Sequence, residues 1–218
     1  MRQRLPPSAS VAEPTEGDRL FAPAAARNRE PLCELLAAHA PQTGRALEIA
    51  SGTGQHVVAF AKRLPGLTWH PSDIATARRA SINAHAVDAD LPNITPVDFL
   101  PIFNKFYYNE HGHFDLIMLA NLLHLIPTDA VQNLVTEAAL ALAPSGTLIL
   151  YGPFKRAGQL TSPGDTRFDA ELRAADPAIG YKDDLDMARW LSDAGLSPID
   201  QTEMPANNLA FIAGKPSP

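Results

Sequence analysis

Glycines and carboxylates at a fixed spacing mark the part of the sequence best suited to bind a nucleotide-like ligand. A short apolar segment contains the acid Glu48 and runs into a turn of small residues with Gly52 and Gly54. Glycine adopts positive φ and has no side chain, so a ligand can lie directly against such a turn. A strand, a turn of this kind and a helix form the nucleotide-binding corner of doubly wound α/β sheets. The sequence therefore predicts a ligand at the carboxyl end of the first sheet strand.

Two departures from the dinucleotide-binding fingerprint narrow the choice of ligand. Val57 stands where the third glycine of G-x-G-x-x-G belongs, so the fingerprint is incomplete. Glu48 precedes the glycines at a place where its charge would repel a pyrophosphate. A carboxylate there suits a cationic or amine-bearing ligand. S-adenosylmethionine (SAM), with a sulfonium and an ammonium group, meets that requirement.

Two further acids end the next two predicted strands. Asp73 follows Gly54 by 19 residues, the spacing of an acid that binds ribose hydroxyls, which fits NAD as well as SAM. Asp98 is in place to accept a hydrogen bond from an adenine amino group, with Ile74 and Phe99 on either side of the base. Any one of these acids alone reads as an exposed strand end or a helix cap. The ordered set of three favours a cofactor site.

The elements that must position these residues alternate between strand and helix patterns. Strands are expected near 45–50, 68–72, 94–98, 114–120, 146–151, 197–204 and 208–214, and helices near 23–40, 55–64, 75–89, 128–142, 167–174 and 183–194. A Gly/Pro/Ser-rich loop is expected at 152–166. This order predicts an α/β fold, a doubly wound, Rossmann-like sheet of seven strands, mostly parallel with the last strand antiparallel. Residues 1–18, rich in Pro, Ser and charge, are expected to be mobile, and 19–218 to form one domain.

The chain resembles the class I SAM-dependent methyltransferases over almost its whole length. It is similar in particular to the UPF0585 group of methyltransferase-like proteins, and the segments that carry this likeness are 19–31, 47–56, 69–74, 120–124, 151–154 and 204–208. The resemblance implies SAM as cofactor but brings no substrate. The expected cofactor-binding residues are Glu48, Ala50, Ser51, Gly52, Thr53, Gly54, Asp73, Ile74, Asp98, Phe99 and Asn121.

The candidates for catalysis follow the fourth and fifth predicted strands. Asn121 and His124 follow the fourth strand, where ligands of such sheets bind, and Tyr151 ends the fifth. His124 is a candidate general base because imidazole titrates near neutral pH, and the alternative is that it packs and shapes the pocket. Methyl transfer asks little acid–base chemistry of a protein, because the sulfonium is already an activated donor.

Residues on three segments are candidates to bind the methyl acceptor. Pro153 and Phe154 follow the fifth strand, where the chain should face the methyl group. Arg27 and Asn28 lie on the N-terminal helix, and Arg27 has three possible roles: pairing with the methionine carboxylate, pairing with an acidic substrate, or solvation on a helix face. Asn207 is either an acceptor residue or a hairpin-turn residue, since asparagine tolerates left-handed backbone.

Composition argues against several other classes of function. The 218 residues carry a net charge of −6 and no basic run, which argues against a nucleic-acid partner. No apolar run approaches the ~18–20 residues of a membrane span, and the start lacks the apolar core of a secretory signal. Cys33 is the only cysteine, so no internal disulfide is expected and a cytoplasmic location follows. His111 and His113 have no third ligand nearby, and no metal site is predicted.

Three functions fit this sequence to different degrees. The favoured one is a SAM-dependent methyltransferase that acts on a small-molecule acceptor. An NAD-dependent oxidoreductase of Rossmann fold is disfavoured by Glu48, by Val57 and by the terminal strand pair. A non-catalytic SAM-binding protein would keep the same acids and glycines, so only turnover separates it from an enzyme.

Overall fold

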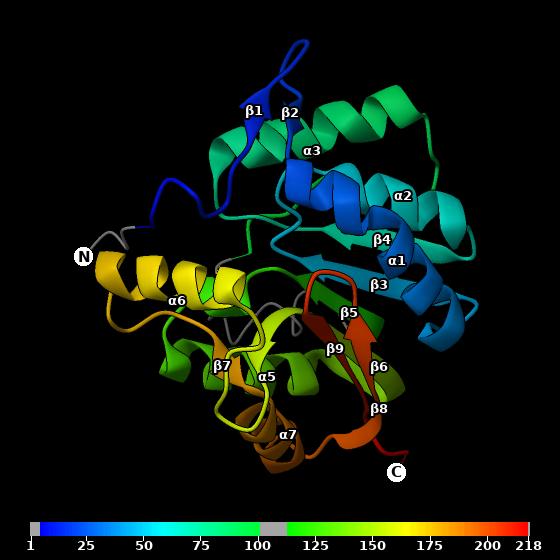
Figure 1. Ribbon diagram of the computed structural model, residues 1–218. Coiled ribbons are helices and arrows are strands. Elements are labelled where there is room, and N and C mark those ends of the chain that lie inside the picture. The colour runs from blue at the N-terminus through cyan, green and yellow to red at the C-terminus, as the bar shows by residue number, and fades with distance from the viewer. Residues whose placement is uncertain (1–4, 101–112, 218) are drawn as a thin grey trace.

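A mostly parallel sheet lies between two layers of helices in the computed structural model, which describes residues 5–100 and 113–217 (Figure 1). In these residues the sheet has seven strands in the order β4-β3-β5-β6-β9-β8, with β7 paired to β6. The strands are β3 (Gly44–Ile49), β4 (Leu67–Pro71), β5 (Phe114–Ala120), β6 (Leu142–Lys155), β7 (Lys182–Asp183), β8 (Ser197–Met204) and β9 (Asn208–Gly214). β9 runs antiparallel to both of its neighbours. The predicted fold class is confirmed.

Helices cover both faces of the sheet and enclose two apolar cores. One face is covered by α1 (Pro23–His39), α2 (Gln55–Arg63) and α3 (Thr76–Ala89), and the other by α5 (Thr128–Ala141) and α7 (Asp184–Asp193). The single turn η1 (Leu123–Leu125) follows β5, and α6 (Pro163–Ala175) lies after β6. Side chains of a strand alternate between the two cores. In β6, Leu150 packs toward α5 and α7, whereas Tyr151 packs toward α1 and α2.

The predicted third strand near 94–98 is not a continuous strand, which corrects the sequence-based expectation. Ile94 makes an isolated parallel bridge with Trp69, and Asp98 makes another with Ser72. Pro96, between the bridged residues, has no N–H to donate, and a proline in the middle of a strand interrupts its hydrogen bonding. The segment still brings Asp98 to the carboxyl end of β4, because the Asp98 N–H donates to the carbonyl of Pro71 at 3.0 Å.

Other boundaries also differ from the prediction. β6 continues to Lys155, so the expected loop starts four residues later, because residues 152–153 still pair with β9. α6 begins at Pro163 instead of 167, because Ser162 caps its N-terminus by accepting a hydrogen bond from the Asp165 N–H. No helix among the described residues is long and apolar enough to cross a bilayer.

Residues 8–22, here termed the N-terminal strap, run from α6 to α3. The Ser8 hydroxyl donates to Glu171 of α6 at 2.6 Å, and the Arg78 guanidinium of α3 donates to Ser10. Within the strap, β1 (Glu13–Pro14) pairs with β2 (Leu20–Phe21) in a small antiparallel ladder. The strap therefore contacts helices on both sides of the carboxyl edge of the sheet.

Candidate functional site

The turn between β3 and α2, residues 50–54, has three left-handed residues. Ala50, Gly52 and Gly54 have φ of 54°, 61° and 90°. A Cβ at Gly54 would lie 2.8 Å from the Ile82 backbone, so a side chain at this position would collide with α3. A Cβ at Gly52 would meet only the flexible end of Arg78, at 3.1 Å, and one carbonyl at 3.9 Å. Gly52 is thus the place where the backbone of the turn is most accessible. The left-handed Ala50 carries no signal in the sequence.

Side chains of the turn are occupied in holding its shape. The Ser72 N–H donates to the Ser51 hydroxyl at 3.1 Å, and the Ser51 N–H donates to the Ser72 carbonyl at 2.8 Å. The Thr53 hydroxyl donates to Gln55, and the Ser81 hydroxyl of α3 donates to the Thr53 carbonyl at 2.7 Å. Ser51 and Thr53 are both buried. Their predicted place at the site is therefore structural, with the backbone of the turn left to face a ligand.

The three strand-end acids lie together beside this turn. The Glu48 carboxyl is buried, and its Oε2 atom has no hydrogen-bond partner. Burial raises the pKa of Glu48 to about 8. Asp73 accepts from the Gly52 N–H at 3.1 Å and from the Ala75 N–H at 2.8 Å, one bond to each carboxylate oxygen. The Asp73 N–H in turn donates to the Asp98 carbonyl at 3.1 Å. The backbone thus ties the ends of three adjacent segments into one group.

This group has the polar and apolar features expected of a site that binds a nucleoside ligand with a cationic end. A carboxylate oxygen accepts two hydrogen bonds, so each oxygen of Asp73 keeps one acceptor position for a ribose hydroxyl. The unpartnered Glu48 oxygen suits an ammonium group. Ile74 and Phe99 are 57% and 60% exposed, unusually open for large apolar side chains. Arg79 lies over the Phe99 ring at 5.1 Å. The residues present therefore fit SAM.

The ends of β5 and β6 meet at the opposite side of the turn. Asn121 has a left-handed φ of 57°, and its N–H donates to the Tyr151 carbonyl at 2.9 Å. The Tyr151 side chain is buried below α1, and burial raises the pKa of its phenol. Asn28 of α1 is also buried, and its Oδ1 atom lies 2.7 Å from the Nε2 atom of His56, whereas Arg27 is exposed. The structure thus brings Asn121 and Tyr151 together, with Asn28 and Arg27 on the neighbouring α1.

His124 lies in η1 among aromatic rings. Its ring packs edge-on against Phe168 at 5.7 Å and Tyr181 at 6.1 Å. Burial, with a smaller effect of the Lys182 charge, lowers the pKa of His124 to about 3. An imidazole with so low a pKa is neutral at physiological pH but binds a proton weakly. Between the two roles considered for His124, this environment favours shaping the pocket.

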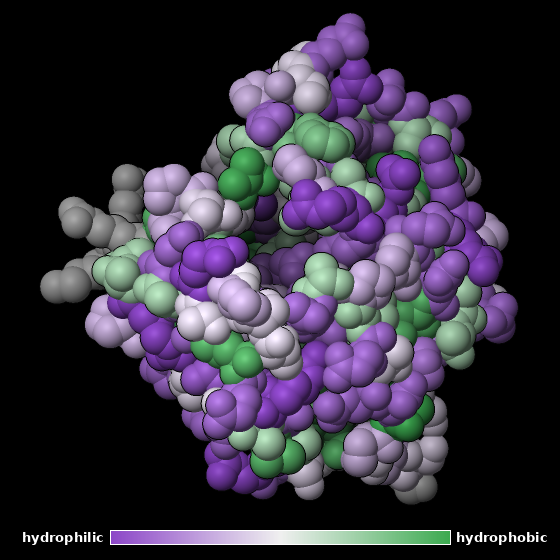
Figure 2. Space-filling model, in the orientation of Figure 1, coloured by the Kyte–Doolittle hydropathy of each residue, from purple (hydrophilic) through white to green (hydrophobic). Residues whose placement is uncertain are grey.

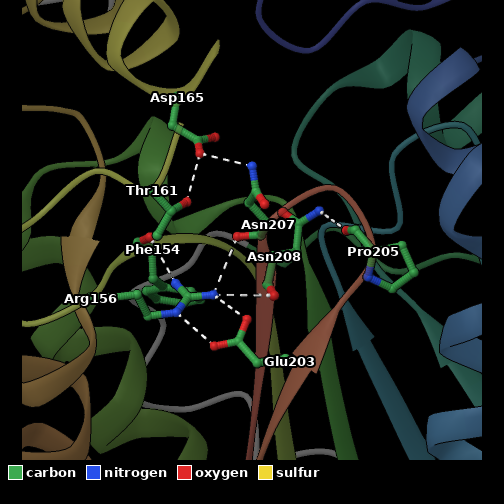
Figure 3. Close-up of polar contacts among 8 residues, drawn as sticks. All are labelled: Phe154, Arg156, Thr161, Asp165, Glu203, Pro205, Asn207 and Asn208. Carbon is green, nitrogen blue, oxygen red and sulfur yellow. Dashed lines mark hydrogen bonds and ion pairs between the residues drawn. The ribbon is translucent and has the colours of Figure 1, made fainter. Parts of the chain in front are cut away.

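Asn207 lies in the β8–β9 turn, where it is held by two charged side chains (Figure 3). Its side-chain amide donates to Asp165 at 3.2 Å, and its backbone carbonyl accepts from Arg156 at 3.4 Å. Arg156 also binds both carboxylate oxygens of Glu203, at 3.0 and 2.8 Å. Asn207 has a φ of 60°, as expected of the turn residue that was its alternative role. Its amide nitrogen is occupied, so any contact with an acceptor would fall to its other atoms.

Asp165 is the centre of a polar cluster beside the β8–β9 turn. Its carboxylate accepts from the hydroxyls of Thr161, Ser162 and Tyr181 in addition to the Asn207 amide. The cluster therefore fastens α6, the segment before β7 and the β8–β9 turn to one another. Thr161 and Ser162 are near neighbours of Asp165 in the chain, but nothing in the local pattern reveals that Tyr181 and Asn207 also donate to it from two other segments.

Pro153 and Phe154 lie within β6 and not in a loop. Pro153 pairs with Asn208 of β9, and Phe154 is 1% exposed. The Phe154 ring packs edge-on against Phe211 at 4.9 Å in the core below the sheet. Both residues support the wall of the site from behind. His111 lies outside the described residues. Among the residues described, no three His, Cys, Asp or Glu side chains are grouped as metal ligands.

The fold defines the class of the molecule: a Rossmann-like domain of class I methyltransferase architecture. It superposes on an O-methyltransferase family protein from Burkholderia thailandensis with a TM-score of 0.75, at 18% identity, over 89% of this chain and 58% of that one. For human N-acetylserotonin methyltransferase in complex with SAM, the TM-score is 0.72 at 15% identity, over 89% and 53% of the two chains. This chain thus spans little more than half the length of these neighbours.

The chain belongs to the family described as Protein of unknown function (DUF938), which matches residues 19–215. A further structural neighbour is CalO1, a methyltransferase in calicheamicin biosynthesis in its S-adenosylhomocysteine (SAH)-bound form. Its TM-score is 0.70 at 16% identity, over 89% of this chain and 54% of that chain.

Replacing Glu48 with Gln should raise thermal stability at about pH 8 more than at about pH 5. The pKa of Glu48 in the fold, about 8, lies above its ordinary value of 4.5. The folded state therefore keeps a proton that the unfolded chain releases, and wild-type stability falls as pH rises between these values. Glutamine does not titrate. Melting temperatures of both proteins across this pH range measure the difference, and a gain that is the same at both ends would contradict a raised pKa.

Replacing Asp165 with Ala should lower the free energy of unfolding by about 2–3 kcal/mol, because buried donors lose their acceptor. Urea unfolding at neutral pH measures this change. Asp193→Ala, at an exposed position at the end of α7, is the matched control, with an expected effect within about 0.5 kcal/mol. Equal losses in the two variants would show that the Asp165 cluster does not stabilise the fold.

Proposed function

We propose that this protein is a SAM-dependent methyltransferase that acts on a small-molecule acceptor. The observation that carries the proposal is the convergence of three strand-end acids on an accessible left-handed turn, with one buried carboxyl oxygen of Glu48 lacking a partner. Buried polar atoms nearly always have partners, so an exception calls for an explanation. A ligand with an ammonium group at this position provides one.

Each residue of the cofactor half has a definite role in this proposal. Glu48 accepts from the ammonium group, Asp73 holds the ribose hydroxyls, and Asp98 accepts from the adenine amino group. Ile74 and Phe99 contact the two faces of the base. The backbone of residues 50–54 lies along the ligand, and Asn121 lines the floor between the methyl donor and the acceptor. Bound SAM would supply a methyl group already activated by its positive sulfur.

The chemical work of the protein is then mainly orientation. Holding a nucleophile and the methyl carbon in line with sulfur removes much of the entropic barrier to transfer. Neither His124, with a pKa of about 3, nor Tyr151, with its pKa raised by burial, is tuned to take a proton at neutral pH. Arg27, Asn28 and Tyr151 contact the acceptor in this proposal. Pro153, Phe154 and Asn207 act from behind by fixing the wall.

The comparisons support the proposal at the level of fold. The similar structures are described as methyltransferases, and two of them have SAM or SAH bound. Their sequences are at most 18% identical to this one in the three cases compared, so their acceptors are not transferred. The likeness of six segments to the UPF0585 methyltransferase-like group is in agreement, and we infer membership of that group.

Two other functions remain distinguishable by experiment. An NAD-dependent oxidoreductase is disfavoured because Glu48 lies where the pyrophosphate would bind and because β8 and β9 replace the plain parallel arrangement. A non-catalytic SAM-binding protein would share the cofactor half of the site. Calorimetric titration with SAM, SAH and NAD distinguishes a methyltransferase from an NAD-dependent oxidoreductase. Transfer of labelled methyl from SAM to a small-molecule extract distinguishes a methyltransferase from a non-catalytic SAM-binding protein.

Gly52→Val should weaken SAH binding by at least roughly tenfold, because a branched side chain would cover the accessible backbone of the turn. Gly52 also has positive φ, so the variant carries backbone strain. Gly195→Val is the matched control, because Gly195 has a φ of 78° and no atom within 4 Å of an added Cβ. We expect the two variants to lose the same amount of melting temperature, and only Gly52→Val to lose affinity for SAH. Wild-type SAH affinity in Gly52→Val would remove the turn from the site.

Asp73→Ala should weaken SAH binding roughly ten- to a hundredfold, the cost of losing hydrogen bonds from a charged acceptor. Asp90→Ala, outside the site at the end of α3, should leave affinity unchanged. SAM and SAH should bind in preference to NAD. Tighter binding of NAD, or an unaffected Asp73→Ala variant, would contradict the proposed function.

A further inference from the structure

Two large apolar side chains lie exposed directly after two of the strand-end acids. Ile74 follows Asp73, just beyond β4, and Phe99 follows Asp98 in the neighbouring segment. The Asp73 N–H donates to the Asp98 carbonyl at 3.1 Å, so Ile74 and Phe99 start from adjacent points of the backbone. Both residues, here termed the apolar pair, are more than half exposed. A single exposed apolar residue is ordinary, whereas two beside a group of acids form a contact surface for a ligand.

One guanidinium contacts both members of the apolar pair. Arg79 comes from the first turn of α3, and its Nη1 atom donates to the Ile74 carbonyl at 2.8 Å and to the Asp73 carbonyl at 3.1 Å. Its Cζ atom lies over the Phe99 ring, 5.1 Å from the centroid. The Nη2 atom donates to the Thr76 hydroxyl at 3.3 Å. Arg79 therefore joins the backbone after β4 to the segment that carries Phe99.

The shape of arginine makes these contacts possible at the same time. A guanidinium is planar, so it stacks on an aromatic ring while its N–H groups donate outward in its own plane. Arg79 covers one face of the Phe99 ring, and the exposure of Phe99 shows that much of the rest of the ring is open. The uncovered face of Phe99 is thus available to a second planar group.

The contacts of Arg79 order a part of the surface that faces the ligand end of the sheet. The surface is hollowed between the start of α1 and α6 (Figure 2), where the carboxyl ends of β3 and β5 lie (Figure 1). Groups that are free to move before binding must be ordered when a ligand arrives, and this ordering costs affinity. A ring and a strand end that are already held avoid this cost.

We propose that Arg79 is a positioning residue that holds the apolar pair ready for the base of a nucleoside. The base lies between Ile74 and the uncovered face of Phe99, with Arg79 stacked on the far side of the same ring. Arg79 itself touches no part of the ligand. The inference rests on the proposed function, because the nucleoside is that of SAM or SAH.

The first measurement uses the protein without ligand. The nine phenylalanines are labelled as 4-fluorophenylalanine, and the Phe99 ¹⁹F signal is assigned from its loss in Phe99→Leu. Arg79→Gln should shift this signal toward that of free 4-fluorophenylalanine and narrow it, because the ring gains freedom. Arg45→Gln is the matched control, because Arg45 lies over the Phe114 ring at 4.7 Å and donates to the His113 carbonyl, but at the amino end of β3. This control should leave the Phe99 signal in place.

The second measurement compares ligands with and without the base. Calorimetry should show that Arg79→Gln weakens SAH and adenosine by the same factor, roughly three- to tenfold, the cost of ordering one or two groups on binding. S-ribosylhomocysteine keeps the ribose and the amino-acid end of SAH but lacks adenine, so its affinity should stay at the wild-type value. Arg45→Gln should leave all three affinities unchanged. A role of Arg79 in stability alone would lower the melting temperature without changing the ratio of the SAH and S-ribosylhomocysteine affinities.

A double-mutant cycle tests whether Arg79 acts through Phe99. Phe99→Leu removes the ring on which both the guanidinium and the base stack, and it should itself weaken SAH. Because Arg79 acts through that ring, Arg79→Gln should cost less affinity in the Phe99→Leu background than in wild type. Arg79→Lys keeps the charge but not the planar shape, and it should behave like Arg79→Gln. Additive losses, or full SAH affinity in Arg79→Lys, would contradict the role assigned to Arg79.

The failure of this inference and that of the proposed function give different results. Wild-type SAH affinity in Arg79→Gln, or an equal loss for S-ribosylhomocysteine, would overturn the positioning role and leave the methyltransferase proposal standing. A saturable shift of the Phe99 signal by adenosine, in a protein that binds neither SAM nor SAH, would defeat the methyltransferase proposal and keep the base site. Failure of adenosine and SAH alike to bind would overturn both. Thermal melts check that each variant is folded.

Discussion

The hydrogen bonds that join the ends of β3 and β4 are the constraint on which the rest of the site depends. Ser51 and Ser72 bond each other through backbone and side chain, and Gly52 donates to Asp73. Parallel strands end at one edge of a sheet but do not by themselves fix how the following turns sit. These bonds set the left-handed course of the turn and orient Asp73 in the same step. The acid predicted to bind a ligand is thus also the acid that shapes the turn.

Glu48 shows that the site and the stability of the fold have opposing requirements. Its carboxyl is 2% exposed, and the pKa raised by burial means that ionisation near neutral pH is unfavourable in the fold. A hydrophobic or amide side chain at this position would suit the core better. The carboxyl becomes an asset only when a cationic group reaches it. Sites that trade stability for binding in this way are common among enzymes.

Local patterns in the sequence predicted most elements and the cofactor half of the site, because these depend on near neighbours in the chain. The left-handed glycines and the acids at strand ends are of this kind. One failure is local, because Pro96 interrupts an expected strand. The others come from contacts between distant segments: aromatic rings pack edge-on around His124, and Tyr181 and Asn207 reach Asp165 from other parts of the chain. His56 was part of a recognised segment, but its link to Asn28 required the packing of α1 on α2.

The N-terminal strap links the glycine turn to residues on both sides of the start of the family match at 19–215: Leu20 and Ala22 lie inside the match, and Ser10 precedes it. The Ser81 hydroxyl accepts from the Leu20 N–H and donates to the turn, and Gln55 likewise joins the Ala22 N–H to Thr53. Arg78 bonds Ser10 while lying against Gly52. An expression boundary drawn at the edge of the family match would keep every recognisable sequence signature and yet release Arg78 over the most accessible part of the turn. Purified protein intended for ligand screening is therefore best produced with the strap intact and with any affinity tag at the other terminus.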